Sequence, residues 1–247
     1  MNAIVAEFIG TALLIIFGNG VVANVVLSRT KGNNSGWIVV TAGWAVGVFV
    51  GVVCSQRFSG AHLNPAITVA LAAAGQFPWG KVAAYIAAQM LGALVGGTMV
   101  FLFYREHFKV TEDPAAKLAC FATAPNIRRL PQALLCEVVG TFVLVLPVFL
   151  IAGASINLPS SSGEATPIGL GALGALPVAL LVFGIGLSLG GATGYAINPA
   201  RDLGPRLAHA LLPVPGKRGS DWRYAWVPVA GPILGGLLAA WVNGLLT

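Results

Sequence analysis

Six long apolar stretches limit how this chain can fold. They cover residues of about 3–27, 37–55, 82–104, 132–153, 169–190 and 225–246. A helix needs about 20 predominantly apolar residues to cross the hydrocarbon core of a bilayer, and each stretch is close to that length or longer. The connectors are polar or rich in turn-forming residues at 28–36, 105–131 and 155–167. The pattern predicts an all-α membrane protein with six transmembrane helices.

The composition agrees with a location in a membrane. Charged residues make up 9% of the 247 residues, whereas a soluble domain has about a quarter. The 32 glycines suit helices that approach one another closely in lipid. The first apolar stretch begins almost at Met1 and contains Glu7, without a basic leader before it. We therefore expect a retained span and not a cleaved signal peptide.

The net charge of +6 does not indicate a nucleic-acid partner. The 14 Lys and Arg residues are scattered through the connectors without a basic stripe, which is typical of loop charges near lipid headgroups. Cys54, Cys120 and Cys136 lack metal-ligand spacing, so we expect them to pack as small apolar side chains. The expected partners exclude nucleic acid, and we expect no metal and no cofactor.

Two further apolar segments are too short to cross a bilayer. One covers 64–75 (NPAITVALAAAG), and the other runs from Asn198 through NPARDLGPRLAHALL to about 212. As a helix, each would be roughly 20 Å long. Irregular backbone at membrane depth is tolerated only where it is buried in protein or lines a wet cavity, and short interrupted segments in matching places indicate a transport site. We therefore predict two re-entrant half-helices.

The two short segments belong to two similar halves of the chain. The motif E-x-x-G-T begins at Glu7 and at Glu137, which lie 57 residues before Asn64 and 61 residues before Asn198. Each half closes with a span that carries paired glycines, namely Gly92, Gly96, Gly231 and Gly235. Three spans and one half-span make an odd number of crossings, so the second half must be inverted. The predicted organisation is one channel domain over 1–247, with repeats and a joining loop at about 1–104, 132–247 and 105–131.

Asn-Pro-Ala begins both short segments. Asparagine is a favoured N-cap and proline suits the first helical position, so Asn64–Pro65 and Asn198–Pro199 each start a helix. In an inverted repeat both starts approach the midplane and direct the positive ends of their dipoles there. Each asparagine carbonyl can cap its own helix, which leaves its NH₂ free to face the space between. Two coincidental N-caps are the alternative, but the matched positions make coincidence a poor explanation.

The stretches SGAHLNPAITVAL and TGYAINPARDLGPR resemble the two signature loops of the aquaporin, or major intrinsic protein, family. The resemblance covers essentially the whole chain, including the glutamate at the head of each half. It implies an aquaporin-like bundle of six spans, one pore per chain and usually a homotetramer. It also implies a plasma or inner cell membrane and a cytoplasmic N-terminus.

Arg201 lies about one helical turn beyond Asn198. Because its guanidinium cannot be neutralised, we expect it to face water, with backbone carbonyls as partners. The resemblance implies that Trp44, Gly186, Tyr195 and Arg201 form the constriction of the pore. Trp44 and Tyr195 would give an apolar wall for a carbon chain, and Arg201 would donate to its hydroxyls. Water-selective members typically carry a histidine at the position of Gly186, where this chain has no side chain.

These residues predict a passive channel for glycerol and similar small uncharged polyols, which also passes water and excludes ions and protons. Asp202, Arg206, Pro228 and Val229 resemble the glycerol-conducting branch of the family. Asp202 lies in the first turn of its half-helix, where the dipole favours a carboxylate. We expect it to brace the loop or Arg201 and not to touch solute. Tyr195 stands where many bacterial glycerol channels carry phenylalanine, and its added hydroxyl bears on the ranking of glycerol against dihydroxyacetone, urea, hydroxy acids and larger polyols.

Other polar residues of the short segments are expected to support the pore. Glu7 and Glu137 could suggest a proton relay, since acids inside a membrane are functional by default. The resemblance instead implies that they hold the backbone of the re-entrant loops. His62 is expected to brace its loop. The resemblance further implies a ladder of backbone carbonyls along one wall, from Gly60, Ala61, His62 and Leu63 in the first loop and from the run 193–196, with Gly194 and Ala196, in the second.

Three other functions compete with a glycerol channel. A strict water channel is the nearest, although Gly186 and Asp202 speak against it. A secondary transporter would need a coupling-ion site, and the sequence has no second cluster of intramembrane acids. An enzyme would need a nucleophile–base pair, a metal cluster or a phosphate loop, none of which the sequence suggests. The positive-inside rule conflicts with the cytoplasmic N-terminus that the resemblance implies. In that orientation only Arg57 and Lys81 would lie near the cytoplasmic side, so the rule favours the opposite topology.

Overall fold

The computed structural model describes residues 1–156 and 166–247. Six helical segments are long and apolar enough to cross a membrane: α1 (Ala3–Val26), α2 (Trp37–Ser59), α4 (Trp79–Phe103), α7 (Leu130–Leu150), the continuous stretch of the 3₁₀ turn η1 (Gly171–Ala175) and α8 (Leu176–Ser188), and α10 (Val227–Leu246). The prediction of an all-α membrane fold with six spans is therefore confirmed.

Two shorter helices lie where half-helices were expected, α3 (Pro65–Ala73) and α9 (Pro199–Leu211). Pro65 and Pro199 are each the first residue of their helix, after an asparagine N-cap in extended conformation. With nine residues, α3 is shorter than predicted. The reason is Gly75, whose φ of 72° reverses the chain directly after the helix.

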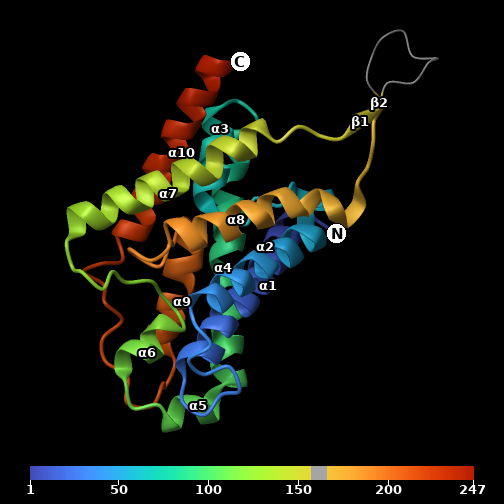
Figure 1. The fold of residues 1–247 in the computed structure, drawn as a ribbon. Coiled ribbons are helices and arrows are strands. Elements are labelled where there is room, and N and C mark those ends of the chain that lie inside the picture. The colour runs from blue at the N-terminus through green and yellow to red at the C-terminus, as the bar shows by residue number, and fades with distance from the viewer. Residues whose placement is uncertain (157–165) are drawn as a thin grey trace.

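The connectors contain short elements of their own. The loop 105–131 forms α5 (Arg105–Val110) and α6 (Pro114–Ala119). The predicted connector 155–167 falls largely outside the described residues. Its two ends pair as the antiparallel strands β1 (Ser155–Ile156) and β2 (Thr166–Pro167), which project from the bundle (Figure 1).

Helices pack against one another both within each half of the chain and between the two halves. Within the halves, α1 packs against α4 and α7 packs against α10, both over long stretches. Between the halves, α9 lies along α4, and α3 lies beside α10 (Figure 1). Each half-helix therefore rests mainly on the closing span of the other half. The symmetry is not complete, because α1 packs closely on α2 while the equivalent helices α7 and α8 touch much less.

The polarity of the bundle is typical of a membrane protein. Large apolar side chains such as Ile38, Leu180 and Trp241 are exposed on its outside. Charged side chains are found inside instead, including Glu7 and Glu137, neither of which has any exposed surface. Ionisable groups enclosed in a membrane bundle mark the place where function should be sought.

Candidate functional site

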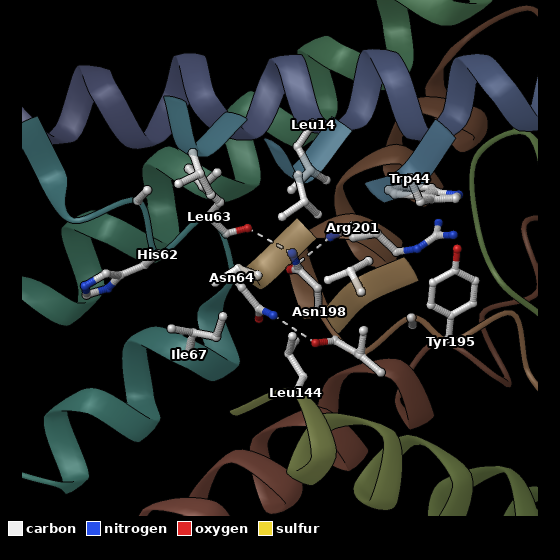
Figure 2. Close-up of a pocket in the computed structure, with 17 residues that line it drawn as sticks. Leu14, Trp44, His62, Leu63, Asn64, Ile67, Leu144, Tyr195, Asn198 and Arg201 are labelled. Atoms are coloured by element: carbon white, nitrogen blue, oxygen red, sulfur yellow. Dashed lines mark hydrogen bonds between the residues drawn. The ribbon is translucent and has the colours of Figure 1, made fainter. Parts of the chain in front are cut away.

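The two Asn-Pro-Ala segments meet head to head in the centre of the bundle (Figure 2). Asn64 Oδ1 accepts a hydrogen bond from the backbone N–H of Ala66 at 2.8 Å. Asn198 Oδ1 accepts from the N–H groups of Ala200 and Arg201 at 3.0 and 3.2 Å. Each asparagine thus caps its own half-helix through its carbonyl oxygen, as expected of a strong N-cap.

The amide nitrogens of the two asparagines are not wholly free, contrary to our expectation. Asn64 Nδ2 donates to the carbonyl of Ile197 at 2.8 Å, and Asn198 Nδ2 donates to the carbonyl of Leu63 at 2.9 Å (Figure 2). An amide NH₂ has two donors, so each asparagine uses one on the opposite loop and keeps one. This exchange fixes both side chains at the point where the two dipoles converge.

The loops before the half-helices have matching backbone conformations. In the first, Gly60, Ala61 and Leu63 have φ values of 84°, 53° and 51°. In the second, Gly194, Tyr195 and Ile197 have φ values of 82°, 37° and 42°. Such left-handed conformations are costly for residues other than glycine, so something in the surroundings must hold them.

The two buried glutamates hold these loops. Glu7 accepts from the N–H groups of His62 and Leu63 at 3.0 and 2.7 Å. Glu137 accepts from the N–H groups of Ala196 and Ile197 at 3.1 and 2.8 Å. Successive N–H groups in alternating conformations form a concave nest for an anion, and here the anion is a side chain.

Further polar groups complete each nest. Glu7 also accepts from Ser59 Oγ at 2.6 Å and from Gln89 Nε2 at 2.8 Å, and Glu137 accepts from Thr193 Oγ1 at 2.8 Å. With this many donors around it, each carboxylate is suited to support a loop.

The glycine of each E-x-x-G-T motif has a role that we did not predict. A Cβ atom on Gly10 would lie 2.6 Å from Leu63 Cδ2, and one on Gly140 would lie 3.0 Å from Ile197 Cγ2. The glutamate therefore holds the loop backbone, while the glycine one turn later makes room for the side chain of the same loop.

Trp44, Tyr195 and Arg201 lie together between two cavities. The inner cavity has a volume of about 70 Å³ and the outer one about 650 Å³, and these three residues line both. Arg201 Cζ lies 3.9 Å from the centre of the Trp44 ring, a cation–π contact. Among the described residues, Arg201 Nη1 is buried without a hydrogen-bond partner, and the guanidinium lies against the face of an aromatic ring where we expected carbonyl partners.

Gly186 lines neither cavity, although we expected it in the constriction. A Cβ atom there would lie 2.7 Å from Thr41 Cγ2 and 3.0 Å from Tyr195 Cζ. The space that glycine leaves is thus filled by Thr41 and by the ring of Tyr195. Trp37, which we did not single out, donates from Nε1 to the Gly186 carbonyl at 2.8 Å.

The walls of the inner cavity differ in polarity. Of the expected carbonyl ladder, Ala61, His62, Leu63 and Ala196 line this cavity, whereas Gly194 lines the outer one and Gly60 neither. His62 faces Thr68, with Nδ1 3.1 Å from its hydroxyl, as expected of a brace. The apolar lining was not predicted and consists of Leu14, Val48, Val52, Ile67, Leu144, Val178, Val182 and Ile197.

Asp202 braces the loops around α9 and not Arg201. Its carboxylate accepts from the backbone N–H and the hydroxyl of Thr123 at 2.7 and 2.8 Å. It also pairs with Arg206, whose Nε and Nη2 lie 2.7 and 3.0 Å away. Arg206 in turn donates to the carbonyls of Ser220 and Thr123 at 2.8 and 2.9 Å. The pair therefore ties the loop 105–131 and the segment after α9 to the half-helix. Pro228 and Val229 lie in the first turn of α10, outside both cavities.

The sequence and the fold of this chain are both similar to those of known proteins. The sequence matches the model of the major intrinsic protein family over residues 1–243. It is 55% identical to a probable glycerol uptake facilitator protein of Thermotoga maritima, over 97% of both chains. It is 53% identical to the glycerol uptake facilitator protein of Bacillus subtilis, over 96% of this chain and 81% of the relative. The solved aquaglyceroporin from Plasmodium falciparum superposes with a TM-score of 0.80 at 29% identity, over 98% of this chain and 95% of that one.

Proposed function

This chain belongs to the major intrinsic protein family, and from this premise we propose that it is a passive channel for glycerol and similar small uncharged polyols. Water passes as well, while ions and protons are excluded, and the chain is not an enzyme. The relatives that are named glycerol uptake facilitators support glycerol as the solute. The chain is a multi-pass integral membrane protein with six spans.

The arrangement of Trp44, Tyr195 and Arg201 between the two cavities carries this proposal. Two aromatic rings offer apolar surface to the C–H edge of a polyol, while the guanidinium offers donors to its hydroxyls. The inner cavity repeats the same division, because apolar side chains face a wall of loop backbone. A linear polyol can therefore give up its water shell here, because its C–H edge meets apolar side chains and its hydroxyls meet hydrogen-bonding groups.

The exclusion of cations and protons is supported by positive charge at two places along the pore. Arg201 is a fixed positive charge at the constriction, with 6% of its surface exposed. Further in, the N-termini of α3 and α9 direct the positive ends of their dipoles toward the two asparagines. Both features repel cations and protons, whereas a neutral solute meets no such electrostatic barrier.

Flux through proteoliposomes tests the proposed function. Stopped-flow light scattering should show glycerol entry well above that of protein-free liposomes, together with water flux, because the filter offers contacts to both edges of a polyol. A pH-sensitive dye in the lumen should report no added proton conductance. Water flux without glycerol flux would favour a strict water channel, and saturable uptake driven by an ion gradient would favour a secondary transporter.

We further propose that the protein is a homotetramer in the plasma or inner cell membrane, and that 1–247 forms one channel domain. The family supports a cytoplasmic N-terminus, which puts the basic loops around α5 and α6 outside. Single cysteines at Lys31 and Gln76, both exposed, check this orientation in a chain without its three cysteines. A membrane-impermeant maleimide applied to intact cells should label position 31 and not position 76. The reverse pattern would support the topology that the positive-inside rule favours.

A further inference from the structure

The hydroxyl of Tyr195 faces the guanidinium of Arg201 across the constriction (Figure 2). Among the described residues, Tyr195 Oη, Arg201 Nη1 and Trp44 Nε1 are buried without a hydrogen-bond partner. Buried polar groups are nearly always hydrogen-bonded, and each exception calls for a reason. The three unpartnered groups lie at one narrow point of the proposed channel. A passing solute that hydrogen-bonds to them would explain why all three lack a partner within the protein.

The position of the Tyr195 ring is fixed by two glycines of the chain segment behind it. A Cβ atom on Gly186 would lie 3.0 Å from Tyr195 Cζ, and one on Gly190 would lie 2.5 Å from Tyr195 Cδ1. The ring therefore occupies the space that two missing side chains leave. Its hydroxyl has a fixed place, because the ring has no room to turn back toward α8.

Trp37 packs against the same ring. Its ring meets Tyr195 edge to face, with centres 5.8 Å apart and an interplanar angle of 76°. Its Nε1 donates to the carbonyl of Gly186 at 2.8 Å. That carbonyl belongs to the last turn of α8, where the helix itself supplies no donor. Trp37 thus holds Tyr195 and occupies an acceptor that lies beside it.

The unpartnered side-chain groups at this point, on Trp44, Tyr195 and Arg201, are mainly donors. Arginine and tryptophan side chains only donate. A phenol hydroxyl can donate or accept, but the cationic guanidinium that faces Tyr195 Oη favours the arrangement in which its lone pairs point to Arg201 and its hydrogen points to the solute. The nearby Gly186 carbonyl lines neither cavity and already accepts from Trp37, so it offers no acceptor to a solute. A carbonyl oxygen of a solute accepts two hydrogen bonds and has no hydrogen of its own to place. An alcohol oxygen at the same point must also find an acceptor for its hydrogen, or leave that hydrogen unbonded at a cost.

We propose that the Tyr195 hydroxyl is a specificity-determining group that favours small neutral polyols carrying a carbonyl group over the corresponding alcohols, with Trp37 as the residue that positions it. This inference rests on the proposed function of the chain as a polyol channel and names a solute class for its filter. Dihydroxyacetone and glycerol are the matched probes, because they share the three-carbon skeleton and differ only at the central carbon.

The experiment measures the permeability of dihydroxyacetone relative to glycerol in proteoliposomes. Tyr195→Phe should lower this ratio about five-fold, the effect of one net hydrogen bond. Trp37→Phe should lower it in the same direction, because phenylalanine cannot donate to the Gly186 carbonyl and the ring that packs on Tyr195 loses its anchor. Tyr104→Phe, at the end of α4, and Trp241→Phe, on the outside of α10, are the controls and should leave the ratio unchanged. A ratio does not depend on the amount of protein reconstituted, so a lower folded yield of a variant does not obscure the result.

The outcomes separate this inference from the proposed function. If the wild-type protein passes neither solute above the lipid background, the proposed function fails. If it passes glycerol and Tyr195→Phe leaves the ratio as it was, only the inference on Tyr195 is overturned. A lower ratio in Tyr195→Phe with an unchanged ratio in Trp37→Phe overturns the positioning role of Trp37 and retains the role of the hydroxyl.

Discussion

Replacing Asp202 with alanine is expected to destabilise the protein by about 3–5 kcal/mol, the usual effect of removing one partner of a buried ion pair. Arg206 has no exposed surface and would keep its charge without a carboxylate beside it. Thr123 would lose its acceptor as well, so the loop 105–131 would loosen from α9. Thermal unfolding in detergent, followed by tryptophan fluorescence or by the fraction that remains monodisperse, should show a midpoint lower by about 6–20 °C.

A surface ion pair serves as the control for this variant. Arg128 pairs with Asp221, and about half of the Arg128 side chain is exposed, at 49%. Arg128→Ala should cost about 1 kcal/mol or less, because exposed ion pairs contribute little. In the double variant Asp202→Leu/Arg206→Met, part of the lost stability should return, since an apolar pair leaves no unpaired charge, while Thr123 and Ser220 stay without their partners. If Asp202→Ala unfolds no more readily than Arg128→Ala, the buried pair does not hold the loops to α9.

The second large effect is expected at Gly235, where α10 approaches α7. A Cβ atom there would lie 2.3 Å from the carbonyl oxygen of Val138 and 2.9 Å from Thr141 Cβ. Because the nearest atom belongs to a helix backbone, it cannot move aside as a flexible side chain could. Gly235→Ala should therefore separate the two helices and lower stability by about 1–3 kcal/mol, with a matching loss of folded yield. Gly92→Ala should act similarly, because its Cβ would lie 2.3 Å from the carbonyl of Phe8.

Glycines in the same helices provide the matched controls. Gly244 in α10 and Gly80 in α4 have open space around the position of a Cβ atom. Alanine at these two positions should be neutral or slightly stabilising, because it restricts the unfolded chain without a clash. Equal midpoints for Gly235→Ala and Gly244→Ala would show that the close approach of α7 and α10 does not limit stability.

The architecture could be predicted because its signals are local. The length of each apolar stretch determines whether it can cross a bilayer, and Asn-Pro determines where a half-helix begins. The predicted end of α3 lies too far along the chain because the apolar pattern includes Gly75, although glycine often marks the residue after a helix end. The sparse contact between α7 and α8 could not be predicted, because a corresponding position in the repeat does not determine how closely two helices pack.

The details of the site required the structure because they join residues that are distant in sequence. Trp37 stands at the start of a span, where an aromatic residue is typical of the membrane interface, so nothing in its position indicated a contact with Tyr195. Leu14 and Leu144 line the inner cavity, yet leucine is equally common on the lipid side. The pairing of Asp202 with Arg206 has i,i+4 spacing and could have been predicted, whereas Thr123 lies in another loop and could not.

The exchange of hydrogen bonds between Asn64 and Asn198 has a consequence for biosynthesis. Each asparagine donates to a carbonyl in the opposite loop, and the partners are 133 and 135 positions apart along the chain. A ribosome adds about 5–20 residues per second, so the first loop waits on the order of ten seconds for its counterpart. During that interval the Asn64 amide and the Leu63 carbonyl lack their final partners inside the bilayer. The nascent amino-terminal half therefore cannot complete its folding alone. These hydrogen bonds form only after the second half has been synthesised and inserted.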